Sequence, residues 1–185
     1  VRMATMQDEN SLSYETQIMY RDNEDSEWVE VDRFEGMQNG WSSLGFTEDN
    51  EKMYKELDHS FSLLDKYIDE QLRKYKLGKE EFFLVGFSQG TMLSLHASIR
   101  RKCKGIIGYS GAFLEGKLPD KIFKNDILLI HGQLDSVVPV ERMKKAEQSL
   151  MGMSDKLETK VYAQLEHSIN EEGLFLGSEF IKKRL

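Results

Sequence analysis

The stretch that decides the fold is Phe82–Gly90, FFLVGFSQG, in which a short apolar run leads directly into Gly-x-Ser-x-Gly. Residues 91–99, TMLSLHASI, follow a helical pattern, so the sequence predicts a strand, a sharp turn and a helix with Ser88 at the apex. The apex backbone is expected to be strained, and glycines at 86 and 90 to remove side chains that would collide there. Strain of this kind is tolerated where it aims a reactive group, here the Ser88 hydroxyl, out of the end of a sheet.

The Gly-x-Ser-x-Gly pattern by itself is weak, because a loop serine between two flexible glycines has the same letters. The apolar run before it and the helical pattern after it favour a catalytic nucleophile at Ser88. A serine hydroxyl is a poor nucleophile near neutral pH, so it needs a base, and the base needs an acid that orients it. The function therefore depends on whether the rest of the chain supplies both groups.

The overall composition narrows the class of protein. The 185 residues, 39% hydrophobic and 31% charged, predict a single soluble domain over residues 1–185. A net charge of −7 argues against nucleic acid as a partner, because phosphate contacts need a basic stripe. No apolar run approaches the roughly eighteen residues of a membrane span. The first residues also lack the pattern of a secretory signal.

One cysteine, Cys103, excludes a disulfide within the chain and favours a reducing, cytoplasmic location. It lies among Arg101, Lys102 and Lys104, whose charges would favour a reactive thiol. The alternative, which we favour, is a half-buried residue at the start of the next strand. No Cys/His cluster has the spacing of a metal site.

Strand-like and helical patterns alternate from Phe82 to the C-terminus. Continuous apolar runs fit strands covered on both faces, as in a parallel sheet. Such runs lie at 105–110 and 126–132, followed by an alternating strand at 158–162 and helices at 140–151 and 169–185. The alternation predicts an α/β fold with a mostly parallel sheet and right-handed crossovers.

A long helix is predicted before this region, from Thr47, its expected N-cap, to about Leu77, with Gly78 just beyond its end. Its apolar residues recur at steps of three and four: Met53, Leu57, Phe61, Leu64, Ile68 and Leu72. The stripe fits a coiled coil or one face of a sheet, and the strand that follows directly favours the sheet.

Residues 1–50 have poor apolar periodicity. Short strands are predicted at 17–20 and 28–31, and a loop at 34–41. We therefore expect residues 1–40 to form an atypical N-terminal segment.

Three candidate catalytic residues each follow a different strand of the predicted sheet. Ser88 follows the first strand, Asp135 follows the strand at 126–132, and His167 follows the strand at 158–162. Parallel strands point their carboxyl ends the same way, so these loops are expected to converge. Serine, acid and histidine in this chain order are typical of an α/β-hydrolase.

The chemistry assigns a role to each residue. His167 would take the Ser88 proton as general base, and Asp135 would hold the imidazole tautomer. The backbone N–H of Gln89 would be one oxyanion donor. Taken singly, Asp135 reads equally as a turn residue before a helix, and His167 as a surface histidine. If Asp135 were only a turn residue and His167 only a surface histidine, both would follow strand ends in the order of a hydrolase by chance. We therefore favour the triad.

Other residues compete less well for these roles. Glu166, beside His167, is a rival acid, but Asp135 has a strand-end loop of its own. His131, at a strand end, is expected to shape the Asp135 loop rather than transfer protons. His96 is expected to pack against the sheet.

Four motifs in order resemble the phospholipase/carboxylesterase family, which includes bacterial carboxylesterases and acyl-protein thioesterases. The motifs are Gly86–Thr91, Gly108–Gly111, His131-Gly132-x-x-Asp135-x-x-Val138-Pro139, and His167. The resemblance covers about Trp41 to the C-terminus. It implies an α/β-hydrolase fold, no cofactor, and hydrolysis of small-molecule carboxylic esters or thioesters by Ser88, Asp135 and His167. It also implies substrate contacts for Trp41, which matches an aromatic residue at the family's active-site rim, and for Val138.

The N-terminal part departs from the family. Members begin with a strand that ends in a His-Gly-x-Gly-like turn, which supplies a second oxyanion donor, whereas no His-Gly pair precedes His131 here. We therefore expect a serine esterase for small to medium acyl chains. The alternatives are a thioesterase or lysophospholipase for long chains, or a catalytically weak binding or assembly module. A missing strand also exposes an edge, which makes a homodimer possible.

Overall fold

The computed structural model describes residues 3–7, 15–20, 29–35, 50–114 and 116–185, with side chains from Tyr54 onward. The chain divides into two compact units, Val1–Glu48 and Asp49–Leu185. The predicted atypical segment, 1–40, falls within the first unit, and the single-domain organisation stays a prediction.

The first unit contains a three-stranded antiparallel sheet of β1 (Met3–Gln7), β2 (Glu15–Tyr20) and β3 (Val29–Glu35), in that order. The two strands predicted here correspond to β2 and β3. The prediction missed β1, because MATMQ is only five residues long and contains no Val, Ile or aromatic residue of the kind that favours strands. It was also wrong to begin a loop at Phe34, since Phe34 pairs with Thr16 in the ladder between β3 and β2.

The second unit is built on a parallel sheet of four strands in the order β4-β5-β6-β7. Their bounds are Phe83–Phe87, Gly105–Tyr109, Asp126–Gly132 and Lys156–Tyr162. All of β5 is buried, and so is β6 after its first residue, as their continuous apolar sequences predict.

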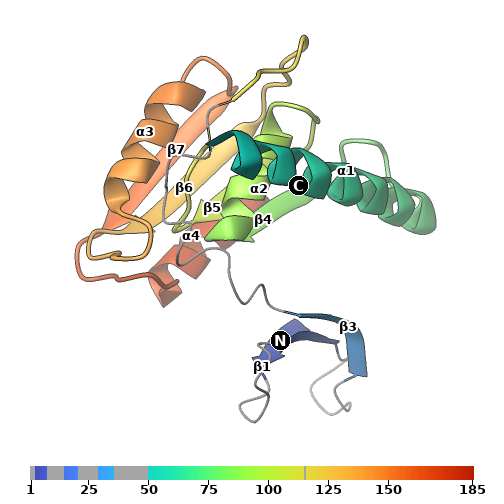
Figure 1. The fold of residues 1–185 in the computed structure, drawn as a ribbon, viewed down its shortest axis with the longest axis horizontal. Coiled ribbons are helices and arrows are strands. Elements are labelled where there is room, and N and C mark those ends of the chain that lie inside the picture. Colours follow the sequence, from blue (N-terminus) through green and yellow to red (C-terminus); the bar gives the residue numbers. More distant parts are fainter. Residues whose placement is uncertain (1–2, 8–14, 21–28, 36–49, 115) are drawn as a thin grey trace. The chain divides into compact units, whose positions relative to one another are not determined.

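Helices cover both faces of this sheet (Figure 1). Their bounds are Asn50–Tyr75 for α1, Gln89–Ser98 for α2, Val140–Leu150 for α3 and Glu171–Lys182 for α4. Successive strand residues point to opposite faces. Thus Ile106 packs with Leu95 of α2 and Met143 of α3, whereas Ile107 packs with Phe180 of α4. Two separate apolar cores, one on each side, hold the sheet in place.

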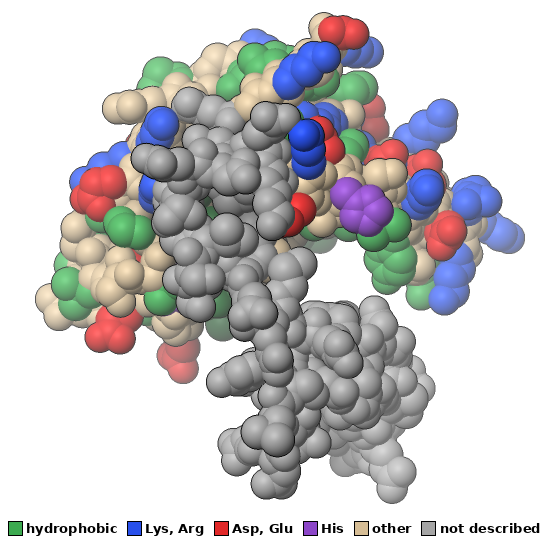
Figure 2. Space-filling view, in the orientation of Figure 1, with side chains coloured by type: hydrophobic (Ala, Val, Ile, Leu, Met, Phe, Trp, Pro, Cys, Tyr) green, Lys and Arg blue, Asp and Glu red, His purple; other side chains and the backbone are tan. Residues whose placement is uncertain are grey.

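The surface of the second unit carries charges of both signs. Figure 2 shows acidic and basic side chains interspersed over the face that it draws. In the described part of the chain, no helix combines the length and apolar character needed to cross a membrane.

The long helix α1 ends two residues earlier than predicted. Lys76, with φ of 55°, takes the left-handed position that ends the helix, and the N–H of Leu77 donates to the carbonyl of Leu72 at 2.9 Å. Gly78 was wrongly predicted for that position. Its N–H instead donates to the Glu81 carboxylate at 2.6 Å, which begins the next turn. The predicted N-cap, Thr47, lies outside the described residues.

Helix α1 packs against α2 (Figure 1). Nε2 of His96 in α2 lies 2.8 Å from the Asp58 carboxylate in α1. Arg101, just beyond α2, bonds to Asp65 at 2.5 Å and Asp69 at 2.6 Å. The expectation that His96 packs against the sheet was therefore wrong. The opposite side of α2, with Leu95 and Ile99, covers the sheet, which leaves His96 to face α1.

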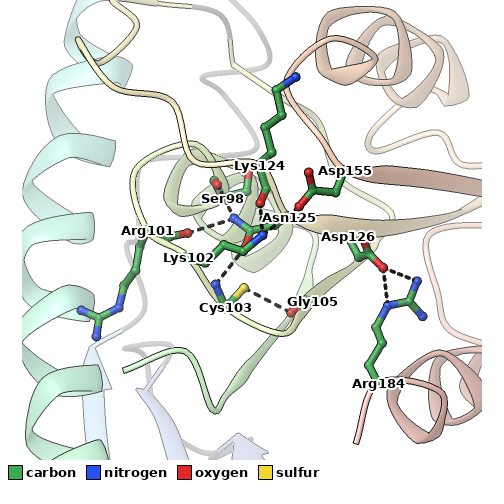
Figure 3. A network of polar contacts seen from close by, with 10 residues as sticks. All are labelled: Ser98, Arg101, Lys102, Cys103, Gly105, Lys124, Asn125, Asp126, Asp155 and Arg184. Carbon is green, nitrogen blue, oxygen red and sulfur yellow. Dashed lines mark hydrogen bonds and ion pairs between the residues drawn. The ribbon is translucent and has the colours of Figure 1, made fainter. Parts of the chain in front are cut away.

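A buried asparagine ties together the amino-terminal end of the sheet (Figure 3). Asn125 is 0% exposed and accepts the N–H of Cys103 at 2.9 Å. Its amide donates to the carbonyls of Ser98 at 2.5 Å and Arg101 at 2.9 Å. The main chain before β5 and after α2 is thus fixed to the start of β6, opposite the end that carries Ser88.

Candidate active site

The Ser88 turn has the strained geometry that its sequence predicts. Ser88 has φ of 52° and ψ of −113°, and its N–H donates to the Tyr109 carbonyl at 2.9 Å. A Cβ on Gly86 would lie 2.3 Å from the carbonyl carbon and oxygen of Gly90, so only glycine fits there. A Cβ on Gly90, by contrast, would meet no described atom within 4 Å. The steric reason expected for Gly90 was therefore wrong.

Thr91 stabilises this turn through its side-chain hydroxyl. Its buried hydroxyl lies 2.9 Å from the Gly86 carbonyl and 2.8 Å from the Tyr109 carbonyl, where it can donate to either. Gly111 lies against it, since a Cβ there would be 2.4 Å from the Thr91 Cβ and 2.8 Å from the Ser88 carbonyl oxygen. The only signal for Thr91 and Gly111 in the sequence was their place in the motifs Gly86–Thr91 and Gly108–Gly111, and no role was predicted for either.

Helix α2 begins directly after the serine. The Ser88 carbonyl accepts the N–H groups of Thr91 at 3.1 Å and Met92 at 3.3 Å. Within the described part of the chain, the N–H of Gln89 has no acceptor. Free N–H groups at a helix N-terminus attract negative charge, so this amide is suited to be an oxyanion donor.

Asp135 and His167 form a hydrogen-bonded pair. Nδ1 of His167 lies 2.8 Å from Oδ2 of Asp135. The other carboxylate oxygen, Oδ1, accepts the N–H groups of Val137 at 3.0 Å and Val138 at 2.8 Å. The Asp135 side chain is 0% exposed, whereas 19% of the His167 side chain is exposed. The acid is therefore fixed and shielded, and the imidazole reaches solvent.

Backbone contacts join the loops that carry this pair. The N–H of Gln133 donates to the Tyr162 carbonyl at 2.9 Å, and the N–H of Leu134 donates to the Leu165 carbonyl at 2.9 Å. A Cβ on Gly132 would lie 2.2 Å from the Leu165 carbonyl oxygen, so glycine permits this close approach. The ends of β6 and β7 are thus held together, as the parallel sheet predicts.

An aromatic contact brings His167 to the serine turn. The rings of His167 and Phe87 have centroids 4.9 Å apart, and Phe87 directly precedes Ser88. No role was predicted for Phe87, whose only signal in the sequence was its place inside Gly-x-Ser-x-Gly. Ser88 Oγ has no hydrogen bond to another described residue. A hydrogen bond between Ser88 Oγ and His167 Nε2 is therefore a proposal.

The remaining predicted residues differ in their placement. Glu166 is exposed, and Asp135 occupies the position on Nδ1 of His167 for which Glu166 was the rival. Trp41 lies outside the described residues. Val138 is 3% exposed, and its substrate contact stays a prediction. The exposed apolar side chains of the same loop are Leu134 at 51% and Val137 at 60%, which the sequence analysis did not single out.

Cys103 is a buried residue. It is 4% exposed, and burial raises the pKa of its thiol to about 11 despite nearby Lys102 and Arg101. A reactive thiol is not formed here, because desolvation of the thiolate outweighs the attraction of those charges.

Comparison with known proteins adds independent evidence. The family described as Phospholipase/Carboxylesterase matches residues 3–185. The chain is 30% identical over 152 residues to acyl-protein thioesterase 1 of Gibberella zeae, which covers 77% of this chain and 63% of that protein. It is also 30% identical over 153 residues to a probable carboxylesterase of Oryza sativa subsp. japonica, which covers 77% of this chain and 54% of that protein. The chain thus spans less than two thirds of the length of either relative.

Solved structures share the fold. The crystal structure of esterase PE8 aligns with a TM-score of 0.68 at 30% identity, over 75% of this chain and 66% of that one. Arabidopsis thaliana SOBER1 aligns with a TM-score of 0.62 at 26% identity, over 75% of this chain and 67% of that one. With its parallel sheet, flanking helices and strained serine turn, the protein has an α/β-hydrolase fold and belongs to the phospholipase/carboxylesterase family.

Proposed function

We propose that the protein is a serine esterase that hydrolyses carboxylic esters of small to medium acyl chains through Ser88, His167 and Asp135. The observation that carries the proposal is the 2.8 Å hydrogen bond between Asp135 and His167. The imidazole of His167 also lies against Phe87, the residue before Ser88. An acid, a base and a strained serine at the carboxyl ends of strands of one parallel sheet are the parts that acyl transfer needs.

The proposed reaction has two steps. His167 uses Nε2 to take the proton from Ser88 Oγ, which attacks the ester carbonyl carbon, and the oxyanion that forms is stabilised by the Gln89 N–H. His167 then returns the proton to the leaving alcohol, and an acyl-Ser88 ester remains. In the second step His167 deprotonates water, which attacks the acyl-enzyme, and the proton goes back to Ser88 Oγ as the acid leaves. Asp135 stabilises the imidazolium in both steps.

The oxyanion hole bears on the expected rate. Among the described residues we assign one donor to it, the N–H of Gln89, and the loss of one donor in comparable enzymes costs about a hundred- to a thousandfold in rate. A second candidate is therefore a catalytically weak hydrolase that serves as a binding or assembly module. A rice relative named probable inactive carboxylesterase, 27% identical over 114 residues, favours keeping this candidate.

The acyl preference is inferred from the surface beside the pair. Phe87, Leu134 and Val137 present exposed apolar side chains there, which suit an apolar acyl group. The alternative is hydrolysis of long-chain thioesters or lysophospholipids, for which the relative named acyl-protein thioesterase 1 is the support. Initial rates on p-nitrophenyl acetate, butyrate, octanoate and palmitate separate the two. Preference for palmitate would reject the small-to-medium range.

Labelling by a fluorophosphonate probe tests the nucleophile directly. Wild-type protein is expected to be labelled and to hydrolyse p-nitrophenyl butyrate, because the probe reacts only with an activated serine. Ser88→Ala should abolish labelling, and His167→Ala should lower the hydrolysis rate by at least about a thousandfold. Ser178→Ala, an exposed serine on α4, is the matched control and should behave as wild type. A folded wild type that is neither labelled nor active would reject the proposal in favour of the binding module.

Two broader properties belong to the same proposal. The single cysteine supports a cytoplasmic location. The outer edge of β4 supports a homodimer, because β5 is its only neighbour in the described sheet and FLVGF contains neither charge nor proline to protect an edge.

A further inference from the structure

A second histidine contacts the Asp135 carboxylate, and the proposed reaction gives it no role. His131 lies one residue before the end of β6 and is 1% exposed. Its Nε2 lies 2.8 Å from the Val138 carbonyl oxygen and 3.3 Å from Oδ2 of Asp135. This Oδ2 is the oxygen that Nδ1 of His167 contacts. Two imidazoles therefore meet at one carboxylate oxygen.

The contacts assign the tautomer of His131. A carbonyl oxygen can only accept, so Nε2 carries the proton and donates it. A neutral imidazole has one N–H, so Nδ1 is then the nitrogen without a proton, and it is buried without a hydrogen-bond partner in the described part of the chain. The single N–H of His131 is thus shared between the Val138 carbonyl and the Asp135 carboxylate.

His131, Asp135 and Val138 form a closed network. Val138 donates its N–H to Oδ1 of Asp135 at 2.8 Å and accepts the His131 proton on its carbonyl. Both oxygens of the carboxylate and both backbone groups of Val138 are engaged. An apolar side chain at 131 would leave the buried Val138 carbonyl without its donor. It would also remove one of the contacts that hold the carboxylate in line with His167 and leave Oδ2 without its second partner.

We propose that His131 is a positioning residue for catalysis, which holds the Asp135 carboxylate in line with Nδ1 of His167. The inference rests on the proposed function, since it assigns Asp135 as the acid of the triad. The polar contacts of His131 are with the Val138 carbonyl and the Asp135 carboxylate. It acts through Asp135, so that His167 presents Nε2 toward Ser88 without a search through other orientations.

The test compares His131→Leu with His131→Gln. The leucine has no donor, and it should lower kcat for p-nitrophenyl butyrate by about 10- to 100-fold with KM within about twofold, because only the aim of the base is lost. The glutamine can place an amide N–H near the Val138 carbonyl, and it should restore kcat to within about threefold of wild type. His131→Phe, which keeps a ring, replaces the leucine if that variant does not fold.

A control separates positioning from loss of stability. Asn125→Ala removes buried side-chain bonds to the backbone at the opposite end of the sheet. At a temperature where circular dichroism shows both variants folded, Asn125→Ala should keep kcat. Wild-type kcat in His131→Leu, equal loss in the leucine and glutamine variants, or the same kcat loss in Asn125→Ala would each overturn the proposal.

A second measurement does not need turnover. The proton between His167 Nδ1 and Asp135 should give a downfield proton resonance, absent in His167→Ala, in wild type and in His131→Gln. In His131→Leu it should move upfield or broaden beyond detection. If wild type shows the resonance but no hydrolysis, the proposed function is rejected. The resonance in His131→Leu and His131→Gln then still decides whether His131 positions the Asp135 carboxylate. An unchanged resonance in His131→Leu would reject the positioning role.

Discussion

At the scale of single residues, His96 makes the free energy of unfolding depend on pH. Burial lowers its pKa from the ordinary value of 6.5, and the charge of Arg100 lowers it further, whereas the hydrogen bond and the charge of Asp58 oppose the shift. His96 therefore binds a proton more readily in the unfolded chain than in the folded one. The free energy of unfolding consequently falls as the pH drops below about 6.5. We expect His96→Gln to flatten this loss, which is at most about 1.4 kcal/mol per pH unit. Urea unfolding from about pH 7 to about pH 5 measures it, with exposed His59→Gln as control. Equal slopes in wild type and His96→Gln would refute the assignment.

At the scale of elements, the strand–turn–helix of β4 and α2 depends on one of its two glycines. Gly86→Ala would place a Cβ 2.3 Å from Gly90 main-chain atoms, which cannot move without opening the turn. We expect it to destabilise the fold by about 1–3 kcal/mol and to abolish probe labelling. Gly90→Ala meets no described atom and should be neutral, or stabilise α2 by up to about 1 kcal/mol. Thermal unfolding of both variants decides this, and equal destabilisation would show that the Gly86 contact is not the cause.

At the scale of the whole molecule, the proposed homodimer depends on the β4 edge. Val85 is 59% exposed there, whereas strand residues in the middle of the sheet, such as Ile106, are 0% exposed. Val85→Lys should shift a concentration-dependent dimer toward monomer in sedimentation velocity, because a charge at an edge opposes strand pairing. Phe175→Lys, at an exposed position on α4, is the control and should leave the dimer intact. A wild type that remains monomeric at all concentrations would remove the dimer from the proposal.

The sequence by itself determined the alternation of strands and helices from Phe82 onward and the three loops that carry Ser88, Asp135 and His167. Those features rest on local patterns: apolar runs, glycines at sharp turns, and residues that follow strands. The strained φ of Ser88 also followed from its motif. The first strand, β1, was not predictable in the same way, because it is short and lacks the Val, Ile and aromatic residues that mark a strand.

Only the tertiary structure decided which residues support the site. The contacts of Phe87 with His167 and of Thr91 with the Tyr109 carbonyl join segments far apart in the chain. His131 contacts the Asp135 carboxylate, four residues later, because the loop after β6 folds back on the strand end. The side that His96 faces was likewise set by packing of α1 on α2. No periodicity encodes such contacts, because they arise where parallel strands bring their ends together and burial forces each polar group to find a partner.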